Sequence, residues 1–259
     1  MTTDSTRVDP VELRDHVMRL YEDLARGPGG GFPIEAGRPL AERLGYPPAE
    51  LDLVPAGAVE SFAGAGYHLD LAAPDAGDSV LDLGSGSGTD SFIAAGRVGP
   101  EGRVLGIDMT PAQVEKARAL AREGGFAPCE FREGSIEEPG LEPVSFDCVI
   151  SNGAVNLSPR KTSVFASAAL ALRAGGRLAM SDIVTEHRLP GEVSRDPSLW
   201  AAGVGGAMRG EDLRGAIESA GLRVEEWRTN GVHRSLSDGA GEAVSALGLT
   251  GVSLLAVKP

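Results

Sequence analysis

The chain has 259 residues, of which 42 % are hydrophobic and 24 % charged, the values of an ordinary globular protein and not of a disordered one. Its length suits one large α/β domain, or such a domain with a lid. The formal net charge of −13 at pH 7 disfavours a nucleic-acid partner, because nucleic-acid binding depends on Lys and Arg that neutralise phosphates. Two cysteines, Cys129 and Cys148, provide neither a disulfide framework nor a CxxC metal site, and we expect no metal.

The N-terminal residues lack the basic start and the apolar segment of a signal peptide. No apolar run in the sequence is long enough to cross a bilayer. We therefore expect a cytoplasmic protein with no membrane partner.

The N-terminal part of the chain is predicted to be helical. Asp9-Pro10 is typical of an N-cap followed by proline at the first helical position, and apolar residues then recur at helical spacing as far as Leu24, so this helix should end near Gly27. Residues 32–69 contain several prolines and are interpreted as short helices. Residues 1–70 are thus predicted to form an N-terminal helical cap, followed by a second, larger domain over residues 71–259.

Strands and helices alternate from Ser79 onward. Strands are predicted at 80–83, 103–108, 130–132, 147–151 and 177–184, and helices at 91–99, 111–123 and 159–173. Such alternation predicts a parallel, doubly wound sheet. Residues 222–228 and 252–257 predict an antiparallel pair at its edge, which gives an α/β, Rossmann-like sheet of seven mostly parallel strands. Thr110 and Gln113 are predicted to form a capping box at the second of these helices.

A glycine-rich turn in VLDLGSGSGTD, residues 80–90, follows the first predicted strand. Without β-carbons its backbone can approach a ligand closely. The GxGxG spacing differs from the GxGxxG of dinucleotide sites, because the third glycine position of that motif falls on Thr89. Asp82 lies within the strand, and Asp108 ends the next strand, where its carboxylate can accept two hydrogen bonds from a ribose diol. These features suit a ligand with a ribose and an ammonium group but no pyrophosphate.

The ordered motifs resemble those of the class I S-adenosylmethionine-dependent methyltransferases. GIDMT at residues 106–110, SNGAVNLSPRK at 151–161 and LRAGGRLAMSDIV at 172–184 continue the pattern. Residues 54–77 and 199–208 extend the resemblance to the bacterial arsenite methyltransferase family. It implies a Rossmann-like fold with S-adenosylmethionine as the methyl donor and S-adenosylhomocysteine as the product.

The resemblance also implies where the donor lies. The glycine turn would contact its methionine part, Asp108 its ribose, Met109 its adenine, and Asn152 would lie under the sulfonium. The implied cofactor-binding residues are Asp82, Gly84, Ser85, Gly86, Gly88, Asp108, Met109, Ser135, Ile136, Glu137 and Asn152. Because a sulfonium carries its own activated methyl group, the protein has mainly to align a nucleophile behind that carbon, which can supply ~7–11 kcal/mol of the barrier.

The acceptor side departs from the arsenite methyltransferases. Those enzymes hold trivalent arsenic with cysteine thiolates, and two of those positions are Gly153 and Gly203 here, which offer no ligand. We therefore expect a small-molecule organic acceptor in an enlarged pocket, with residues 185–210 as a lid. The predicted substrate-binding residues are Gly153, Asn156, Trp200, Gly203 and Met208.

Tyr67 and His68 lie where the resemblance places residues beside the methyl group, and with Asn152 they are the predicted catalytic residues. His68 is the first candidate to take a proton from a hydroxyl or amine acceptor, because an imidazole titrates near neutral pH. His187 and His233 are weaker candidates, and a carbon or sulfur acceptor needs no base.

Three functions stay open at this stage. The favoured one is methyl transfer to a small organic molecule, such as one of specialised metabolism. The second is a metalloid methyltransferase with an atypical site, and the third is a protein that binds the donor but has lost or altered catalysis. The sequence does not distinguish a monomer from a homodimer.

Overall fold

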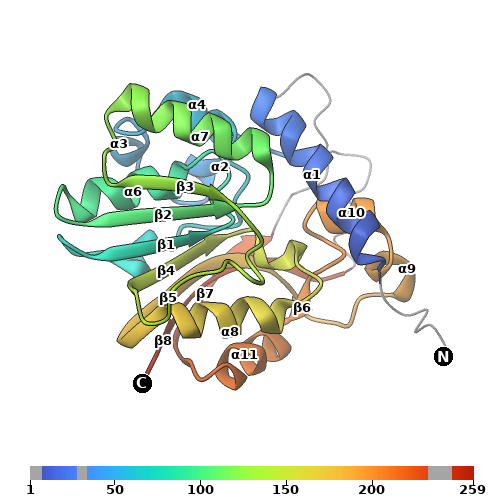
Figure 1. Ribbon diagram of the computed structural model, residues 1–259. Helices are drawn as coiled ribbons and strands as arrows, with labels where there is room; N and C mark the ends of the chain where they lie inside the picture. Colours follow the sequence, from blue (N-terminus) through green and yellow to red (C-terminus); the bar gives the residue numbers. More distant parts are fainter. Residues whose placement is uncertain (1–7, 28–33, 233–246) are drawn as a thin grey trace.

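A computed structural model describes residues 8–27, 34–232 and 247–259. Its centre is one twisted sheet in the strand order β3-β2-β1-β4-β5-β8-β7 (Figure 1). The parallel strands are β1 (Ser79–Leu83), β2 (Arg103–Asp108), β3 (Cys129–Glu133), β4 (Phe146–Asn152) and β5 (Leu172–Thr185). The antiparallel strands are β8 (Leu249–Val257), beside β5, and β7 (Arg223–Val232), at the edge. The predicted mostly parallel Rossmann-like sheet is confirmed, with a two-residue eighth strand, β6 (Met208–Arg209), beside β5.

Helices cover both faces of the sheet (Figure 1). One face carries α6 (Thr89–Val98), α7 (Pro111–Gly124) and the short helices α2 (Arg38–Arg43), α3 (Pro48–Leu51), α4 (Ala56–Glu60) and α5 (Leu69–Ala72). The other face carries α8 (Lys161–Ala171) and α11 (Gly210–Ser219). Apart from these lie α1 (Pro10–Arg26), α9 (Gly191–Ser194), α10 (Pro197–Ala201) and the 3-10 turn η1 (Val155–Leu157).

Burial on both faces explains the sequence of the central strands. In β4 the residues from Phe146 to Ser151 are all buried, as expected for a parallel strand covered by helices on each side. Successive side chains along a strand point to opposite faces of the sheet and belong to two separate hydrophobic cores. Val80 of β1 packs toward α6 and α7, whereas Leu81 packs toward α8. Residues of the predicted cap, such as Leu40 and Tyr46, belong to the same core as Val80, and the cap boundary at residue 70 stays a prediction.

Helix α1 lies across the carboxyl-terminal edge of the sheet, beside α10 (Figure 1). Its predicted N-cap is confirmed, since Oδ1 of Asp9 accepts a hydrogen bond from the backbone N–H of Val11 at 2.8 Å. The apolar side chains of Leu13 and Val17 are buried against Ala201 of α10. Packing against α10 therefore holds α1 over the sheet edge.

Two local predictions were wrong. Thr110 makes no side-chain cap at α7, because the side chain of Gln113 is buried and its Nε2 donates instead to the carbonyl of Tyr21 at 2.9 Å. Helix α8 ends at Ala171 and β5 begins at once, before the Gly175-Gly176 pair that was expected to precede the strand.

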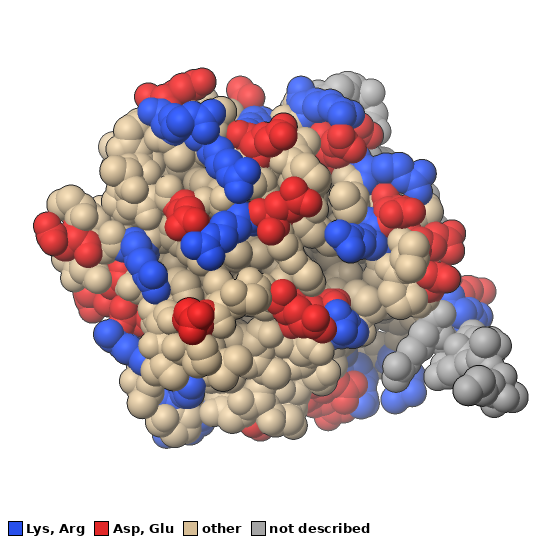
Figure 2. Space-filling view, viewed as in Figure 1, with Lys and Arg blue, Asp and Glu red and all other residues tan. Residues whose placement is uncertain are grey.

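Charged groups are mixed over the surface. On the face shown in Figure 2, acidic and basic side chains lie interspersed, and the basic ones do not gather into one area. Within the described ranges no helix is long and apolar enough to span a membrane.

Candidate functional site

A cavity of about 770 Å³ opens at the carboxyl ends of β1, β2 and β4. The strand order reverses between β1 and β4, and this is the position at which open α/β sheets bind ligands. Ten of the residues predicted to bind the donor line the cavity: Asp82, Gly84, Ser85, Gly86, Asp108, Met109, Ser135, Ile136, Glu137 and Asn152. The fold thus brings together segments that are far apart in the sequence.

The turn after β1 needs glycine for two different reasons. Gly84 has φ 81°, and a β-carbon there would lie 2.2 Å from Cβ of Ala154, so the turn and the loop after β4 approach too closely for any side chain. Gly88 does not line the cavity; a β-carbon on it would lie 2.8 Å from the ring of Phe131. We therefore withdraw Gly88 from the predicted donor site, because its place at the start of α6 is set by packing.

Asp108 is oriented by backbone groups. Its Oδ2 accepts from the N–H of Gly86 at 2.9 Å, and its Oδ1 accepts from the N–H of Thr110 at 2.8 Å. Burial raises the pKa of this carboxyl, while the two N–H groups act in the opposite direction. A ligand hydroxyl can bind the lone pairs that these contacts leave free.

Asp82 lies deeper in the same cavity. It is 2 % exposed, and its Oδ2 accepts a hydrogen bond from Oγ of Ser91 at 2.6 Å. Burial, and secondly the negative charge of Asp90, raise its pKa to about 8. A positively charged ligand group beside Asp82 would offset both effects.

Asn152 joins the end of β4 to the N-terminal part of the chain. Its Oδ1 accepts from the N–H of Ala65 at 2.7 Å, and its Nδ2 donates to the carbonyl of Gly66 at 2.9 Å and to the hydroxyl of Tyr46 at 2.8 Å. The side chain borders the cavity, but these contacts already engage it. It therefore fixes the cavity wall, which Gly153 continues with backbone atoms alone.

Sequence reasoning missed Tyr46 and Asp90. The buried hydroxyl of Tyr46 donates to Oδ1 of Asp90 at 2.5 Å, and Asp90 lines the cavity beside Asp82. Asp90 directly follows the glycine turn, and that position was an available signal. Tyr46 carried no such signal, since 106 residues separate it from Asn152.

The predicted base, His68, is not at the cavity. It is 0 % exposed, and neither ring nitrogen forms a side-chain hydrogen bond with another described residue. Burial lowers its pKa, so the neutral form is favoured. Tyr67 is also outside the cavity, and its hydroxyl donates to Glu50 at 2.9 Å. We therefore withdraw both as catalytic residues; His187 does not line the cavity, and His233 lies outside the described residues.

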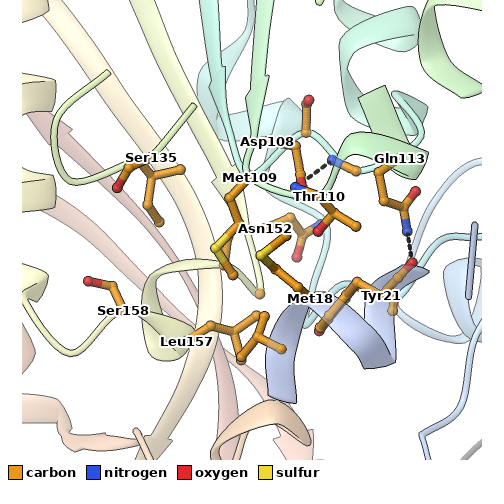
Figure 3. Close-up of a pocket in the computed structure, with 18 of the residues that line it drawn as sticks. Met18, Tyr21, Asp108, Met109, Thr110, Gln113, Ser135, Asn152, Leu157 and Ser158 are labelled. Atoms are coloured by element: carbon orange, nitrogen blue, oxygen red, sulfur yellow. Dashed lines mark hydrogen bonds between the residues drawn. The ribbon is translucent and has the colours of Figure 1, made fainter. Parts of the chain in front are cut away.

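Helix α1 forms the wall opposite the strand ends. Met18 and Tyr21 extend from α1 toward Met109 and Leu157 (Figure 3). The dashed line between Gln113 and Tyr21 in Figure 3 is the hydrogen bond from Gln113 that holds the carbonyl of Tyr21. An apolar surface on α1 therefore closes a cavity whose floor is polar.

Gly153 and Gly203 meet at a second, smaller cavity. It measures about 30 Å³, and Tyr21, Ala63, Gly64 and Gly153 line it as well as the large cavity. The sequence had predicted an enlarged pocket here, but this space holds only one or two water molecules. The backbone carbonyl of Ala63 lies 3.3 Å from where a β-carbon on Gly153 would be, and Cδ1 of Ile183 lies 3.2 Å from that position on Gly203.

The other predicted substrate-binding residues contact the end of β5 or lie in the segment that follows it. The N–H of Asn156 donates to Asp182 at 2.9 Å, and its Nδ2 donates to the carbonyl of Ile183 at 2.7 Å. Nζ of Lys161 lies 4.5 Å from the ring centre of Trp200. These side chains, like Met208 in β6, line neither cavity. They fasten the segment after β5, so we no longer assign them to direct substrate contact.

The two thiols do not meet at either cavity. Cys129 begins β3 and Cys148 lies in the middle of β4, and burial raises the pKa of each to about 12. Within residues 8–27, 34–232 and 247–259 no three His, Cys, Asp or Glu side chains are grouped so that they could hold a metal ion.

Comparison with known proteins adds an independent observation. A family model described as a methyltransferase domain matches residues 74–226. An arsenite methyltransferase of Halobacterium salinarum is 38 % identical over 232 residues, which cover 84 % of this chain and 59 % of that protein. An aklanonic acid methyltransferase of a Streptomyces species is 38 % identical over 127 residues, 49 % of this chain and 58 % of its own. The chain thus spans about six tenths of the length of these two curated relatives.

A solved structure agrees with these relatives. The crystal structure of an arsenic(III) S-adenosylmethionine methyltransferase from Chlamydomonas reinhardtii is 34 % identical to this chain, with a TM-score of 0.69. The match covers 82 % of this chain and 73 % of that one.

Proposed function

The chain belongs to the class I S-adenosylmethionine-dependent methyltransferases, and from this premise we propose that it transfers a methyl group from S-adenosylmethionine to a small organic molecule. One observation carries the proposal. The cavity at the carboxyl ends of β1, β2 and β4 has an oriented carboxylate, Asp108, on one side and the backbone of Gly153 on the other.

The residues present fit the donor. The absence of a β-carbon at Gly84 keeps the turn close to Ala154. Asp108 has lone pairs free for a ribose diol, and the carboxyl of Asp82 can pair with an ammonium group. A volume of about 770 Å³ is in the range of cavities that bind drug-sized molecules.

S-adenosylmethionine supplies a methyl group on a positively charged sulfur. The chain's own residues bind and orient: Asp108 fixes the nucleoside, Asn152 fixes the end of β4, and the apolar side chains of α1, among them Val17 and Met18, exclude water. Alignment of donor and acceptor can supply ~7–11 kcal/mol, so no covalent nucleophile is needed.

A trivalent arsenic acceptor is the second candidate, favoured by the similarity to arsenite methyltransferases. Against it, soft thiolates are the expected ligands of such a centre, and glycine stands at the two positions named above. Turnover of arsenite in the presence of glutathione, with a methylated arsenical as product, would establish this function. The absence of that product would remove it.

The donor site is tested by calorimetric titration with S-adenosylhomocysteine. Asp108→Ala should weaken binding by about 1.5–3 kcal/mol, roughly tenfold to 150-fold, through loss of a charged hydrogen bond to the ribose. Glu133→Gln is the matched control, since Glu133 is exposed, ends β3 and pairs in register with Asp108. Equal affinity of the two variants would remove Asp108 from the site.

A further inference from the structure

The small cavity beyond Gly153 has an uneven lining. Among the described residues around it, Tyr21 and Glu35 alone present polar side-chain groups, and the others are apolar side chains or glycines such as Leu40, Ile183 and Gly203. It adjoins the large cavity along Gly64 and Gly153. The space is thus polar at two points only, next to the place proposed for the methyl group.

Tyr21 stands between the two cavities and lines both. Its backbone carbonyl is held by Gln113, whereas its hydroxyl makes no hydrogen bond with any other described residue. Burial, and secondly the negative charge of Asp108, raise the pKa of the phenol. Tyr21 therefore keeps its proton and can donate a hydrogen bond to a ligand.

Glu35 borders the cavity on its solvent side, where its side chain is 38 % exposed. Nη1 and Nη2 of Arg43 donate to its two carboxylate oxygens. Such a carboxylate still has free lone pairs for an O–H or N–H group of a ligand. The described residues that line the small cavity include no Lys or Arg, so an anionic acceptor would find no positively charged partner there.

We propose that this cavity receives the reacting group of an uncharged alcohol, phenol or amine, held by a hydrogen bond from Tyr21 and by another to Glu35. The inference rests on the proposed function and assigns its acceptor class. A lone pair of the acceptor oxygen or nitrogen forms the bond to the methyl carbon. The carbon–sulfur bond breaks with its electron pair left on sulfur, and the acceptor proton passes to Glu35 and then to solvent. The body of the acceptor lies along the apolar wall of α1.

The test compares three probes of similar size, 4-methylphenol, 4-methylaniline and benzoate, with S-adenosylmethionine as donor and S-adenosylhomocysteine release as readout. The inference predicts methylation of the phenol or the amine and none of benzoate. Glu35→Gln should lower kcat/KM for that acceptor at least tenfold, and Glu35→Asp should restore part of it. Tyr21→Phe should raise the acceptor KM several-fold.

Glu42→Gln is the matched control, because Glu42 forms a comparable exposed ion pair with Arg38 but borders neither cavity. All variants should bind S-adenosylhomocysteine within twofold of the parent, which shows that they are folded. Preference for benzoate, equal kcat/KM in the Glu35 and Glu42 variants, or no turnover of phenol and amine by a protein that binds S-adenosylhomocysteine would overturn the inference. Failure to bind S-adenosylhomocysteine would overturn the proposed function as well.

Discussion

Replacement of Asp82 by asparagine should change the pH dependence of stability. Asp82 is almost fully buried at the floor of the large cavity, and its pKa is raised from 3.8 to about 8 by burial and by the charge of Asp90. The folded protein thus holds this proton more tightly than the unfolded chain. The contribution of Asp82 to stability is fully present below pH 3.8 and is lost as the pH rises through about 8.

The magnitude follows from this pKa difference. Each pH unit between the two pKa values, 3.8 and about 8, costs up to about 1.4 kcal/mol, so the whole interval is worth at most about 6 kcal/mol. Asparagine has the same size and can still accept the hydrogen bond from Ser91. The free energy of unfolding of the variant should therefore equal that of the parent near pH 4 and exceed it by several kcal/mol near pH 9.

Urea unfolding followed by circular dichroism at pH 5, 7 and 9 measures this difference directly. The gap between Asp82→Asn and the parent should widen steadily with pH. Asp75→Asn, a change at an exposed carboxylate, serves as the control and should leave the pH dependence of the free energy of unfolding unchanged. If the parent and Asp82→Asn lose stability with pH at the same rate, the reasoning about this buried carboxyl is refuted.

Two further predictions concern residues around the cavity. Lys161→Met should lower the free energy of unfolding by about 1–3 kcal/mol, because Nζ donates to the buried carbonyls of Asn156 and Ser158, which would lose that partner. It should also change the fluorescence of Trp200, and an unaltered spectrum would argue against the contact between Lys161 and the Trp200 ring. Gly88→Ala should lower the melting temperature, because the φ of 96° and the nearby Phe131 ring both oppose a β-carbon. The affinity of the folded variant for S-adenosylhomocysteine should be unchanged. A loss of that affinity without a loss of stability would return Gly88 to the donor site.

The parts of the fold that the sequence predicts depend on local pattern. Buried parallel strands read as apolar runs, and the turn after β1 needs glycine because of its positive φ at Gly84. The acidic residue at the end of β2, Asp108, follows the same logic, since its position in a strand fixes the edge at which it lies. For these reasons most of the predicted donor residues line one cavity.

The acceptor side could not be predicted in this way, because it depends on contacts between distant segments. The packing of α1 over the strand ends brings Tyr21 beside Gly153, and no local spacing encodes that contact. His68 was predicted as the base from the resemblance, but in the fold it is completely buried at the start of α5. The spacing of Thr110 and Gln113 predicted a capping box, yet the side chain of Gln113 donates a hydrogen bond to the carbonyl of Tyr21 instead. In each case a tertiary contact outweighed the local signal.

A crystal structure of the protein with S-adenosylhomocysteine tests the central claim most directly. The nucleoside should lie in the cavity at the ends of β1, β2 and β4, with its ribose hydroxyls on Asp108 and its sulfur next to Gly153. Density for the nucleoside at any other place, or a cavity that stays empty at saturating concentration, would contradict the account.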